Sequence, residues 1–194
     1  MNIYDFDDTI YNGDTNKHII LFGLKKHPKL TLNALLKAKK LNKEYKKGMI
    51  EFERVKEVML SFIFETPNKE EFIKEFVDTH MKNIKPWYIS KKTENDIIIS
   101  ASYELWIKEF ANRLGVKYVL GTRVDDEGII LGKNCKGEEK IKRLNLLIQD
   151  AKVATMHSDS SCDIPLFDMA QRGYVVEGNK IKTYYKGYKF KNNK

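Results

Sequence analysis

From Asp96 onward, short apolar segments alternate with segments of helical periodicity. Apolar runs such as Ile97-Ile98-Ile99 are typical of buried β-strands. Strands that alternate with helices form parallel sheets through right-handed crossovers. The pattern therefore indicates an α/β fold with a mostly parallel sheet. It predicts strands at 97–99, 118–120, 153–156 and 174–176, helices at 103–114, 138–149 and 164–170, and a hairpin at 124–130.

A long helical block interrupts this pattern after the first strand. Residues 1–6 form the first predicted strand, and helical periodicity then runs from residue 13 to about residue 88. Because the strand–helix pattern resumes after the block, we predict two domains. An α/β core comprises residues 1–12 and 89–194, and residues 13–88 form a separate helical lid, or cap.

The chain of 194 residues is strongly basic, with 35 Lys and Arg, 27 Asp and Glu, and a net charge of +8. This balance fits three kinds of partner: nucleic acid, an anionic membrane surface or small phosphorylated substrates. The cap and the segment 180–194 each carry a net charge of +6, so the remainder carries −4. We interpret the basic cap as a surface that attracts an anionic substrate towards an acidic core, and we do not expect nucleic-acid binding.

Composition also bears on location. No apolar run approaches the roughly 18 residues that a membrane span needs. The two cysteines, Cys135 and Cys162, form no CxxC pair, and the first residues do not resemble a secretory leader. We therefore predict a cytoplasmic protein without a membrane span.

Acidic residues directly follow the first predicted strand, in the segment Asp5-Phe6-Asp7-Asp8-Thr9. In an extended chain residues i and i+2 point to the same side, so Asp5 and Asp7 can face one site. Ligands of open α/β sheets bind at the carboxyl ends of the strands. Two carboxylates held together repel each other, and a divalent cation or a shared proton relieves that repulsion. The alternative is an acidic turn in which Asp8 or Thr9 caps the next helix.

Ser100 and Lys140 lie at two later junctions of the pattern. Ser100 ends a predicted strand, where its hydroxyl can bind an anionic oxygen beside a backbone N–H; the alternative is that Ser100 or Ser102 caps the next helix. Lys140 follows Gly137 in the first turn of a helix. A cation there is poorly placed for the helix dipole, which favours a specific anionic partner over a solvated surface charge.

A serine-rich loop with two acids follows the predicted strand at 153–156. Asp159 and Asp163 are either metal ligands or residues that form a turn and cap the next helix. His157 and Cys162, in the same loop, are interpreted as structural.

In this order the four segments resemble the motifs of the haloacid dehalogenase-like (HAD) superfamily of phosphohydrolases. The local sequence around residues 99–102, 121–124 and 134–140 is similar to its phosphoserine phosphatase-like branch, subfamily IB. The resemblance covers residues 1–12 and roughly 89–180. It implies a Rossmann-like, mostly parallel sheet core with a helical C1-type cap inserted between the first two motifs. The motifs are Asp5-Phe6-Asp7-Asp8-Thr9, Ile99-Ser100, Lys140 and Asp159-Ser160-Ser161-Cys162-Asp163.

The resemblance also implies an activity, a Mg²⁺-dependent phosphatase that hydrolyses a small phosphomonoester through an aspartyl-phosphate intermediate. Asp5 would be the nucleophile and Asp7 the general acid and base. Mg²⁺ would be held by Asp5, the backbone carbonyl of Asp7 and Asp159, with Asp163 as a further ligand or as the residue that orients the ligands. The implied phosphate-binding set is Thr9, Ser100, Ala101 and Lys140.

The sequence departs from the phosphoserine phosphatase pattern at three places. Asp8 stands where those enzymes carry a serine, His157-Ser158 replaces a glycine, and the cap lacks a clear match to their substrate-selecting segments, so phosphoserine is not the expected substrate. Candidate residues on the cap side of the pocket are Asp14, Lys17, His18 and Arg54.

Three other functions stay open at this point. A phosphorylatable receiver module would be shorter and would lack the helical insert. A non-catalytic anion or nucleic-acid binding protein would use the basic cap and the tail 180–194, where lysines alternate with aromatic residues. A phosphotransferase would use the same acidic site with an acceptor other than water. The oligomeric state is not predicted.

Overall fold

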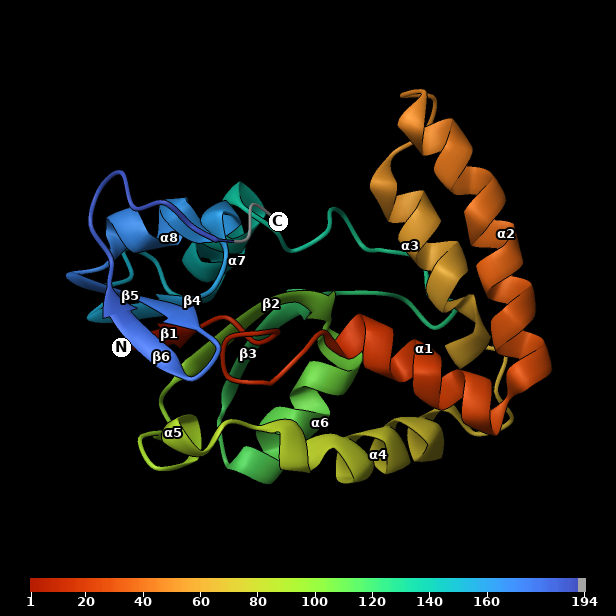
Figure 1. The fold of residues 1–194 in the computed structure, drawn as a ribbon, viewed down its shortest axis with the longest axis horizontal. Helices are drawn as coiled ribbons and strands as arrows, with labels where there is room; N and C mark the ends of the chain where they lie inside the picture. Colours follow the sequence, from red (N-terminus) through yellow and green to blue (C-terminus); the bar gives the residue numbers. More distant parts are fainter. Residues whose placement is uncertain (192–194) are drawn as a thin grey trace.

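The computed structural model describes residues 1–191, which form a six-stranded sheet in the order β3-β2-β1-β4-β5-β6. The first five strands are parallel and β6 runs antiparallel to β5 (Figure 1). The α/β fold with a mostly parallel sheet is therefore confirmed. The strands are β1 (Asn2–Tyr4), β2 (Ile97–Tyr103), β3 (Tyr118–Thr122), β4 (Thr155–Ser158), β5 (Arg172–Glu177) and β6 (Lys180–Thr183).

Helices cover both faces of this sheet (Figure 1). Helices α7 (Glu138–Leu147) and α8 (Ile164–Met169) lie on one face, and α6 (Glu104–Leu114) lies on the other with α4 (Lys69–His80) and α5 (Pro86–Ile89). Successive strand residues point to opposite faces. Accordingly, Ile97 and Ile99 belong to the hydrophobic cluster under α7 and α8, whereas Ile98 belongs to the cluster under α6.

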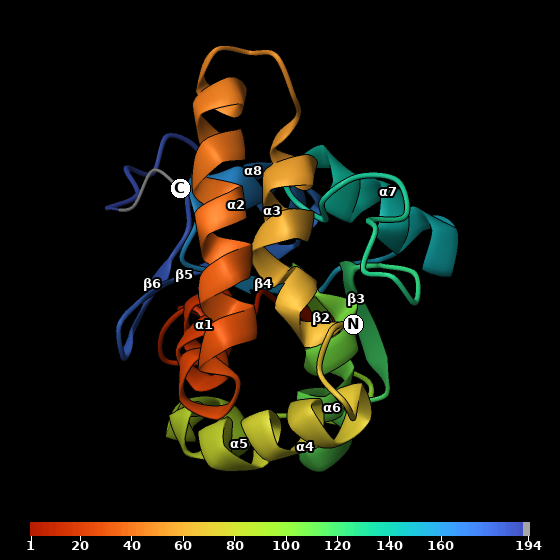
Figure 2. The same cartoon turned by 90° about the vertical axis from the view of Figure 1, so that its right-hand side faces the viewer.

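The remaining helices of the insert rise away from the sheet, with α2 and α3 side by side (Figure 2). They are α1 (Thr15–Lys26), α2 (Pro28–Lys46) and α3 (Phe52–Leu60), and two 3₁₀ turns follow at Ser61–Ile63 and Met81–Asn83. Helix starts carry the expected signals, because the Asp14 side chain accepts N–H bonds at the start of α1 and Pro28 begins α2. The division into residues 13–88 and the rest stays a prediction.

Strand β2 is longer than the pattern indicated. It continues to Tyr103, and no side chain caps the start of α6. The alternative in which Ser100 or Ser102 caps this helix is therefore wrong, because both residues lie within the strand. Strand β4 also begins two residues later than predicted, since its pairing with β1 starts at Thr155 opposite Asn2. The hairpin at 124–130 is confirmed by an antiparallel bridge between Val124 and Ile130.

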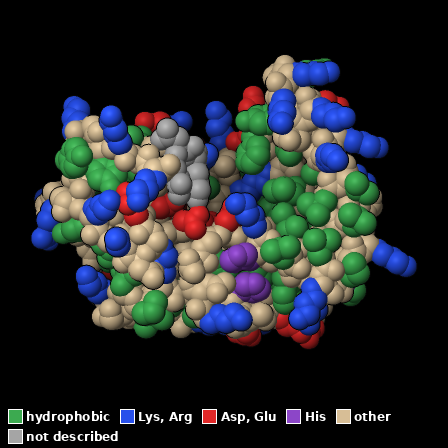
Figure 3. Space-filling view, in the orientation of Figure 1, with side chains coloured by type: hydrophobic (Ala, Val, Ile, Leu, Met, Phe, Trp, Pro, Cys, Tyr) green, Lys and Arg blue, Asp and Glu red, His purple; other side chains and the backbone are tan. Residues whose placement is uncertain are grey.

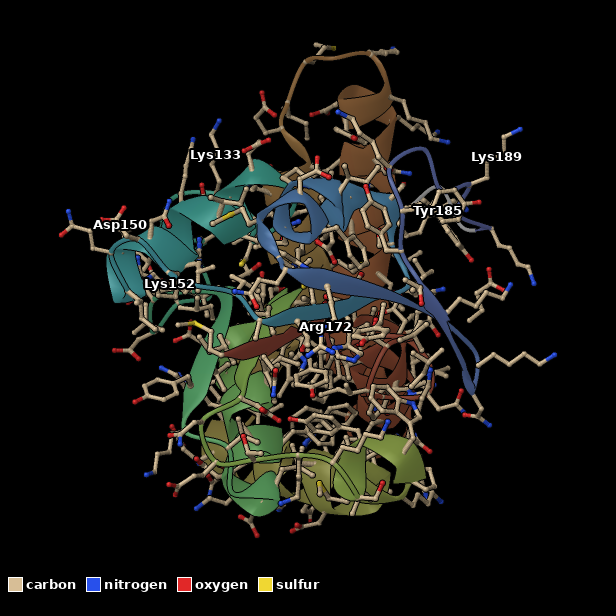
Figure 4. All side chains as sticks on the ribbon, turned by 90° about the vertical axis from the view of Figure 1, so that its left-hand side faces the viewer. Lys133, Asp150, Lys152, Arg172, Tyr185 and Lys189 are labelled. Carbon is tan, nitrogen blue, oxygen red and sulfur yellow. The ribbon has the colours of Figure 1, made fainter. Side chains whose placement is uncertain are left out.

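The basic segment after β6 folds back onto α8. Tyr184 stacks on Phe167 with ring centroids 4.4 Å apart, and Phe190 packs against the same ring. Tyr185 and Lys189 instead point outwards (Figure 4). Two aromatic residues that the nucleic-acid alternative would use for base stacking are thus engaged in packing, and residues 192–194 of this tail lie outside the described part. No helix in residues 1–191 combines the length and apolar character that crossing a membrane requires.

Candidate active site

The predicted site residues gather at the carboxyl edge of the three central strands. Asp5 and Asp7 follow β1, Ser100 lies in β2 directly after Ile99, where the regular pairing with β3 is interrupted, and Asp159 follows β4. This edge of the sheet faces α1 and α3 (Figure 1). Open α/β sheets bind their ligands at this position.

Lys140 holds two of the acids together. Its Nζ lies 2.7 Å from Asp5 Oδ1 and 2.8 Å from Asp163 Oδ1, and all three side chains are buried. Ser158 adds a 2.6 Å hydrogen bond to Asp163 Oδ2. Gly137 makes this placement possible, because its φ of 57° and ψ of −129° lie in a region that side-chain-bearing residues avoid, and α7 begins directly after it.

Thr9 connects the first and last acidic segments. Its Oγ1 lies 3.3 Å from Asp5 Oδ2 and 3.2 Å from Asp159 Oδ1, and it accepts a 3.0 Å hydrogen bond from the backbone N–H of Asp159. A hydroxyl has one proton to donate, so the two carboxylates share it. Thr9 is fully buried behind these carboxylates, and its contact with phosphate stays a prediction.

Asp7 belongs to a separate hydrogen-bond group. Its Oδ1 accepts a 2.6 Å bond from the backbone N–H of Thr15, and its Oδ2 accepts bonds from Ser102 Oγ at 2.6 Å and Ser100 Oγ at 3.4 Å. Burial raises the pKa of Asp7, and the hydrogen bonds from Ser102 and Thr15 oppose that shift. A carboxyl group with a raised pKa is suited to giving and taking a proton near neutral pH.

The other buried acids, Asp5, Asp159 and Asp163, lie close enough to affect one another's protonation. Burial raises the pKa of Asp5; Lys140 opposes this shift, whereas Asp163 and Asp159 add to it. Burial disfavours the charged form of Lys140, but Asp163 and Asp5 more than compensate and raise its pKa. Lys140 thus contacts two of these buried carboxylates, Asp5 and Asp163, and the nearby Asp159 adds negative charge that a divalent cation would stabilise.

This donor set fits Mg²⁺. No group of three or more His, Cys, Asp or Glu side chains within residues 1–191 is arranged to hold a metal ion by itself. Mg²⁺ does not need such a group, because it binds through one or two carboxylates and completes its shell with water and phosphate oxygens. Asp5 and Asp159, joined through Thr9, are two such carboxylates.

A cavity of about 390 Å³ opens above these acids, between the sheet edge and the insert. Figure 3 shows the surface hollowed at this place. Asp5, Asp7, Ala101, Lys140, Asp159 and Asp163 are among the residues that line it on the sheet side. The insert contributes Asp14, Asn16, Lys17 and Ile20 from the first helix region, and Phe52, Lys56 and Met59 from α3.

Of the four residues predicted on the cap side of the pocket, the structure places two at the cavity and two away from it. Asp14 and Lys17 line the cavity. His18 instead hydrogen-bonds the Tyr11 hydroxyl at 2.6 Å, and Arg54 pairs with Glu57 at the surface. His157 is stacked between the rings of Tyr4 and Tyr174, with centroids 4.6 and 4.8 Å away, in agreement with a structural role.

Lys56 is a buried, charged residue of the cavity wall that was not predicted from the sequence. Its side chain is 3% exposed, and its Nζ donates to the Ala101 carbonyl at 2.6 Å and to Asn134 Oδ1 at 2.8 Å. The sequence contains a signal for it, because residue 56 lies four after Phe52 and three before Met59, on the inward stripe of α3. A lysine at such a position needs specific partners.

Comparisons with known proteins agree with this geometry. A model of the haloacid dehalogenase-like hydrolase family matches residues 3–168. Protein CicA of Caulobacter vibrioides (strain NA1000 / CB15N) is 34% identical over 88 residues, which cover 41% of this chain and 40% of that protein. The match thus spans less than half the length of this curated relative.

Two solved structures share the fold. A protein with unknown function from Bordetella pertussis Tohama I aligns with a TM-score of 0.70 at 19% identity, covering 89% of this chain and 87% of that one. A probable phosphoserine phosphatase from Vibrio cholerae aligns with a TM-score of 0.59 at 15% identity, covering 89% and 55%. The family match extends over most of the chain and includes all four predicted motifs. The chain therefore belongs to the haloacid dehalogenase-like hydrolase family, and it shares its fold with a probable phosphoserine phosphatase.

Proposed function

We propose that this protein is a Mg²⁺-dependent phosphatase that hydrolyses a small phosphomonoester through an aspartyl-phosphate on Asp5. The observation that carries the proposal is the placement of Asp5 at the base of the cavity, 2.7 Å from Lys140 and linked through Thr9 to Asp159. A carboxylate held beside a cation can meet a phosphate without prohibitive repulsion.

Each residue has one task in the proposed reaction. An Asp5 oxygen attacks phosphorus in line, the bond to the leaving oxygen breaks, and Asp7 gives that oxygen its proton. Asp7 then takes a proton from water, the water oxygen attacks phosphorus, and the bond to Asp5 breaks to release inorganic phosphate. Lys140, the Ser100 hydroxyl and the backbone N–H of Ala101 would bind the non-bridging oxygens.

Thr9 and Asp163 support this arrangement. Thr9 keeps the Asp5 and Asp159 carboxylates together, and Asp163 orients Lys140 through their ion pair. Mg²⁺ held by Asp5, Asp159 and the backbone carbonyl of Asp7 would neutralise the charge that accumulates on the transferred phosphoryl group. In this proposal residues 13–88 act as the cap of a core formed by 1–12 and 89–194. A cytoplasmic location stays a prediction, and it rests on a sequence whose two cysteines form no CxxC pair.

The decisive variant is Asp5→Asn, assayed on an aryl phosphate with Mg²⁺. Loss of the nucleophilic carboxylate should abolish turnover while the circular dichroism spectrum is unchanged, because Asn preserves the side-chain shape. Asp150→Asn, at an exposed position on the opposite side of the molecule (Figure 4), is the matched control and should retain full activity. Near-normal turnover by Asp5→Asn, or full activity after chelation of Mg²⁺, would contradict the proposal.

The same assay separates hydrolysis from phosphotransfer. Phosphatase activity requires that released inorganic phosphate equals the aryl alcohol formed, also when an alcohol acceptor is added. A deficit of phosphate in the presence of the acceptor would favour the phosphotransferase.

A further inference from the structure

Three leucines on the outer side of the cap are unusually exposed. Leu21 of α1 is 62% exposed, and Leu32 and Leu36 of α2 are 53% and 55% exposed. Figure 3 shows hydrophobic side chains gathered over α1 and the adjoining parts of α2 and α3, with basic side chains around them. Scattered exposed leucines are common, but a gathered apolar patch marks an interaction surface.

Helix α2 buries small side chains and exposes two large apolar ones. Its buried residues are small, namely Thr31, Ala34 and Ala38, whereas Leu32 and Leu36 point outwards. An ordinary surface helix buries its large apolar residues and exposes its polar ones. Packing within this protein therefore does not account for the position of the two leucines.

Lysines extend the same outward stripe. The spacing of three and four residues that defines one helix face joins the leucines to lysines on both sides. All of these side chains are exposed. The stripe consists of Lys29, Leu32, Leu36, Lys40 and Lys43. Residues 17–47 as a whole contain ten lysines and a single acid, Glu44.

We infer that this outer face of α1 and α2 docks onto an anionic lipid surface. The leucines would enter the boundary between headgroups and acyl chains, and the lysines would contact the anionic headgroups. A second copy of the chain would bring two lysine-rich faces together, which is unfavourable. Nucleic acid would use the lysines but leave the leucines exposed, so a lipid surface is the partner that fits both features.

The docked orientation has a consequence for the cavity. Lys17 and Ile20, which line the cavity, lie on the same helix as Leu21. Docking would thus hold the mouth of the cavity beside the lipid surface. The docking itself does not depend on the proposed phosphatase activity, so either can fail alone.

The test is co-sedimentation of the full chain with vesicles of phosphatidylcholine, with and without phosphatidylserine. We expect binding to the mixed vesicles only, weakened by salt, and a loss of roughly tenfold or more in affinity for the double variant Leu32→Ser, Leu36→Ser. The pair Lys40→Glu, Lys43→Glu should lose binding as well. The matched control is the double variant Lys152→Glu, Lys189→Glu. It changes two exposed lysines outside the cap (Figure 4) and should bind the mixed vesicles normally.

Four outcomes would overturn the inference. The first is no binding to anionic vesicles, and the second is binding that the leucine variant retains in full. The third is a concentration-dependent dimer that the leucine variant dissolves, which would assign the face to a second copy. Salt-sensitive binding to RNA or DNA that exceeds vesicle binding would assign it to nucleic acid. Circular dichroism and turnover of a soluble aryl phosphate report whether each variant is folded.

Discussion

At the scale of single residues, Lys56 makes a connection that no motif of the sequence indicated. It lies on α3 of the insert, yet both of its hydrogen-bond acceptors, Ala101 O and Asn134 Oδ1, belong to the core. Burial lowers the pKa of Lys56 to about 7, although Asp7 opposes the shift. A cap residue therefore supplies a positive charge at the cavity wall, and that charge is lost as the pH rises through neutrality.

This charge predicts a pH dependence. If protonated Lys56 helps to bind the phosphorylated substrate, kcat/KM should fall as the pH rises through about 7, since the ammonium form is lost. Lys56→Met should lower kcat/KM by about 10- to 100-fold, as expected for a lost hydrogen bond to a charged group, and should lose this pH dependence. Lys56→Arg should restore part of the activity and move the fall to higher pH. A pH profile in Lys56→Met identical to that of the parent, after comparison with the exposed control Lys37→Met, would refute this role.

At the scale of elements, the sequence predicted which residues lie together better than it predicted the bounds of the elements that carry them. Hydrophobic alternation identified the sheet, and the order of the motifs identified Asp5, Lys140 and Asp159 as neighbours. The extension of β2 was missed because the run Ser100-Ala101-Ser102 lacks the apolar residues that mark a strand. In that extension residues 100 and 102 point to the same side, which is why both hydroxyls reach Asp7. Lys56 was missed for another reason, since its partners are distant in sequence and only the tertiary structure joins them.

Helix α7 depends on a glycine for its starting geometry. Gly137→Ala should destabilise the protein by about 1–3 kcal/mol, because φ of 57° with ψ of −129° is strained for alanine. It should also lower kcat, since a shifted start of α7 would move Lys140. Gly48→Ala is the control, because Gly48 also has a positive φ, 70°, and open space where a Cβ would stand, but lies in the connection between α2 and α3 instead of at the start of α7. Denaturant unfolding and initial rates measure the two effects. Equal stability loss and unchanged kcat in both variants would show that the start of α7 does not position Lys140.

At the scale of the whole molecule, the distribution of charge separates the insert from the sheet, whereas the packing of apolar side chains joins them. The positive charge is concentrated in the insert and the tail, and the acids that we propose to be catalytic lie at the sheet edge. The apolar core makes no such division, because one hydrophobic cluster runs from Ile19 and Phe76 of the insert to Tyr4 and Phe110 of the sheet layer. The part of the insert that includes α4 is therefore packed as core, whereas α2 and α3 rise away from it (Figure 2).

This continuous cluster predicts that the insert and the sheet layer unfold together. Phe76 of α4 is fully buried, with its ring centroid 6.0 Å from that of Phe110 in α6. Phe76→Ala should lower the free energy of unfolding by about 3–5 kcal/mol, and the whole transition should move as one. Fluorescence of Trp106, buried in α6, reports the sheet layer when it is recorded in a Trp87→Phe background, because Trp87 lies in the insert. Far-ultraviolet circular dichroism reports the insert, because much of the helical signal comes from it. Leu36→Ala, at an exposed position, should change stability by no more than about 0.5 kcal/mol. Separate midpoints for the two probes would mean instead that residues 13–88 unfold as an independent unit.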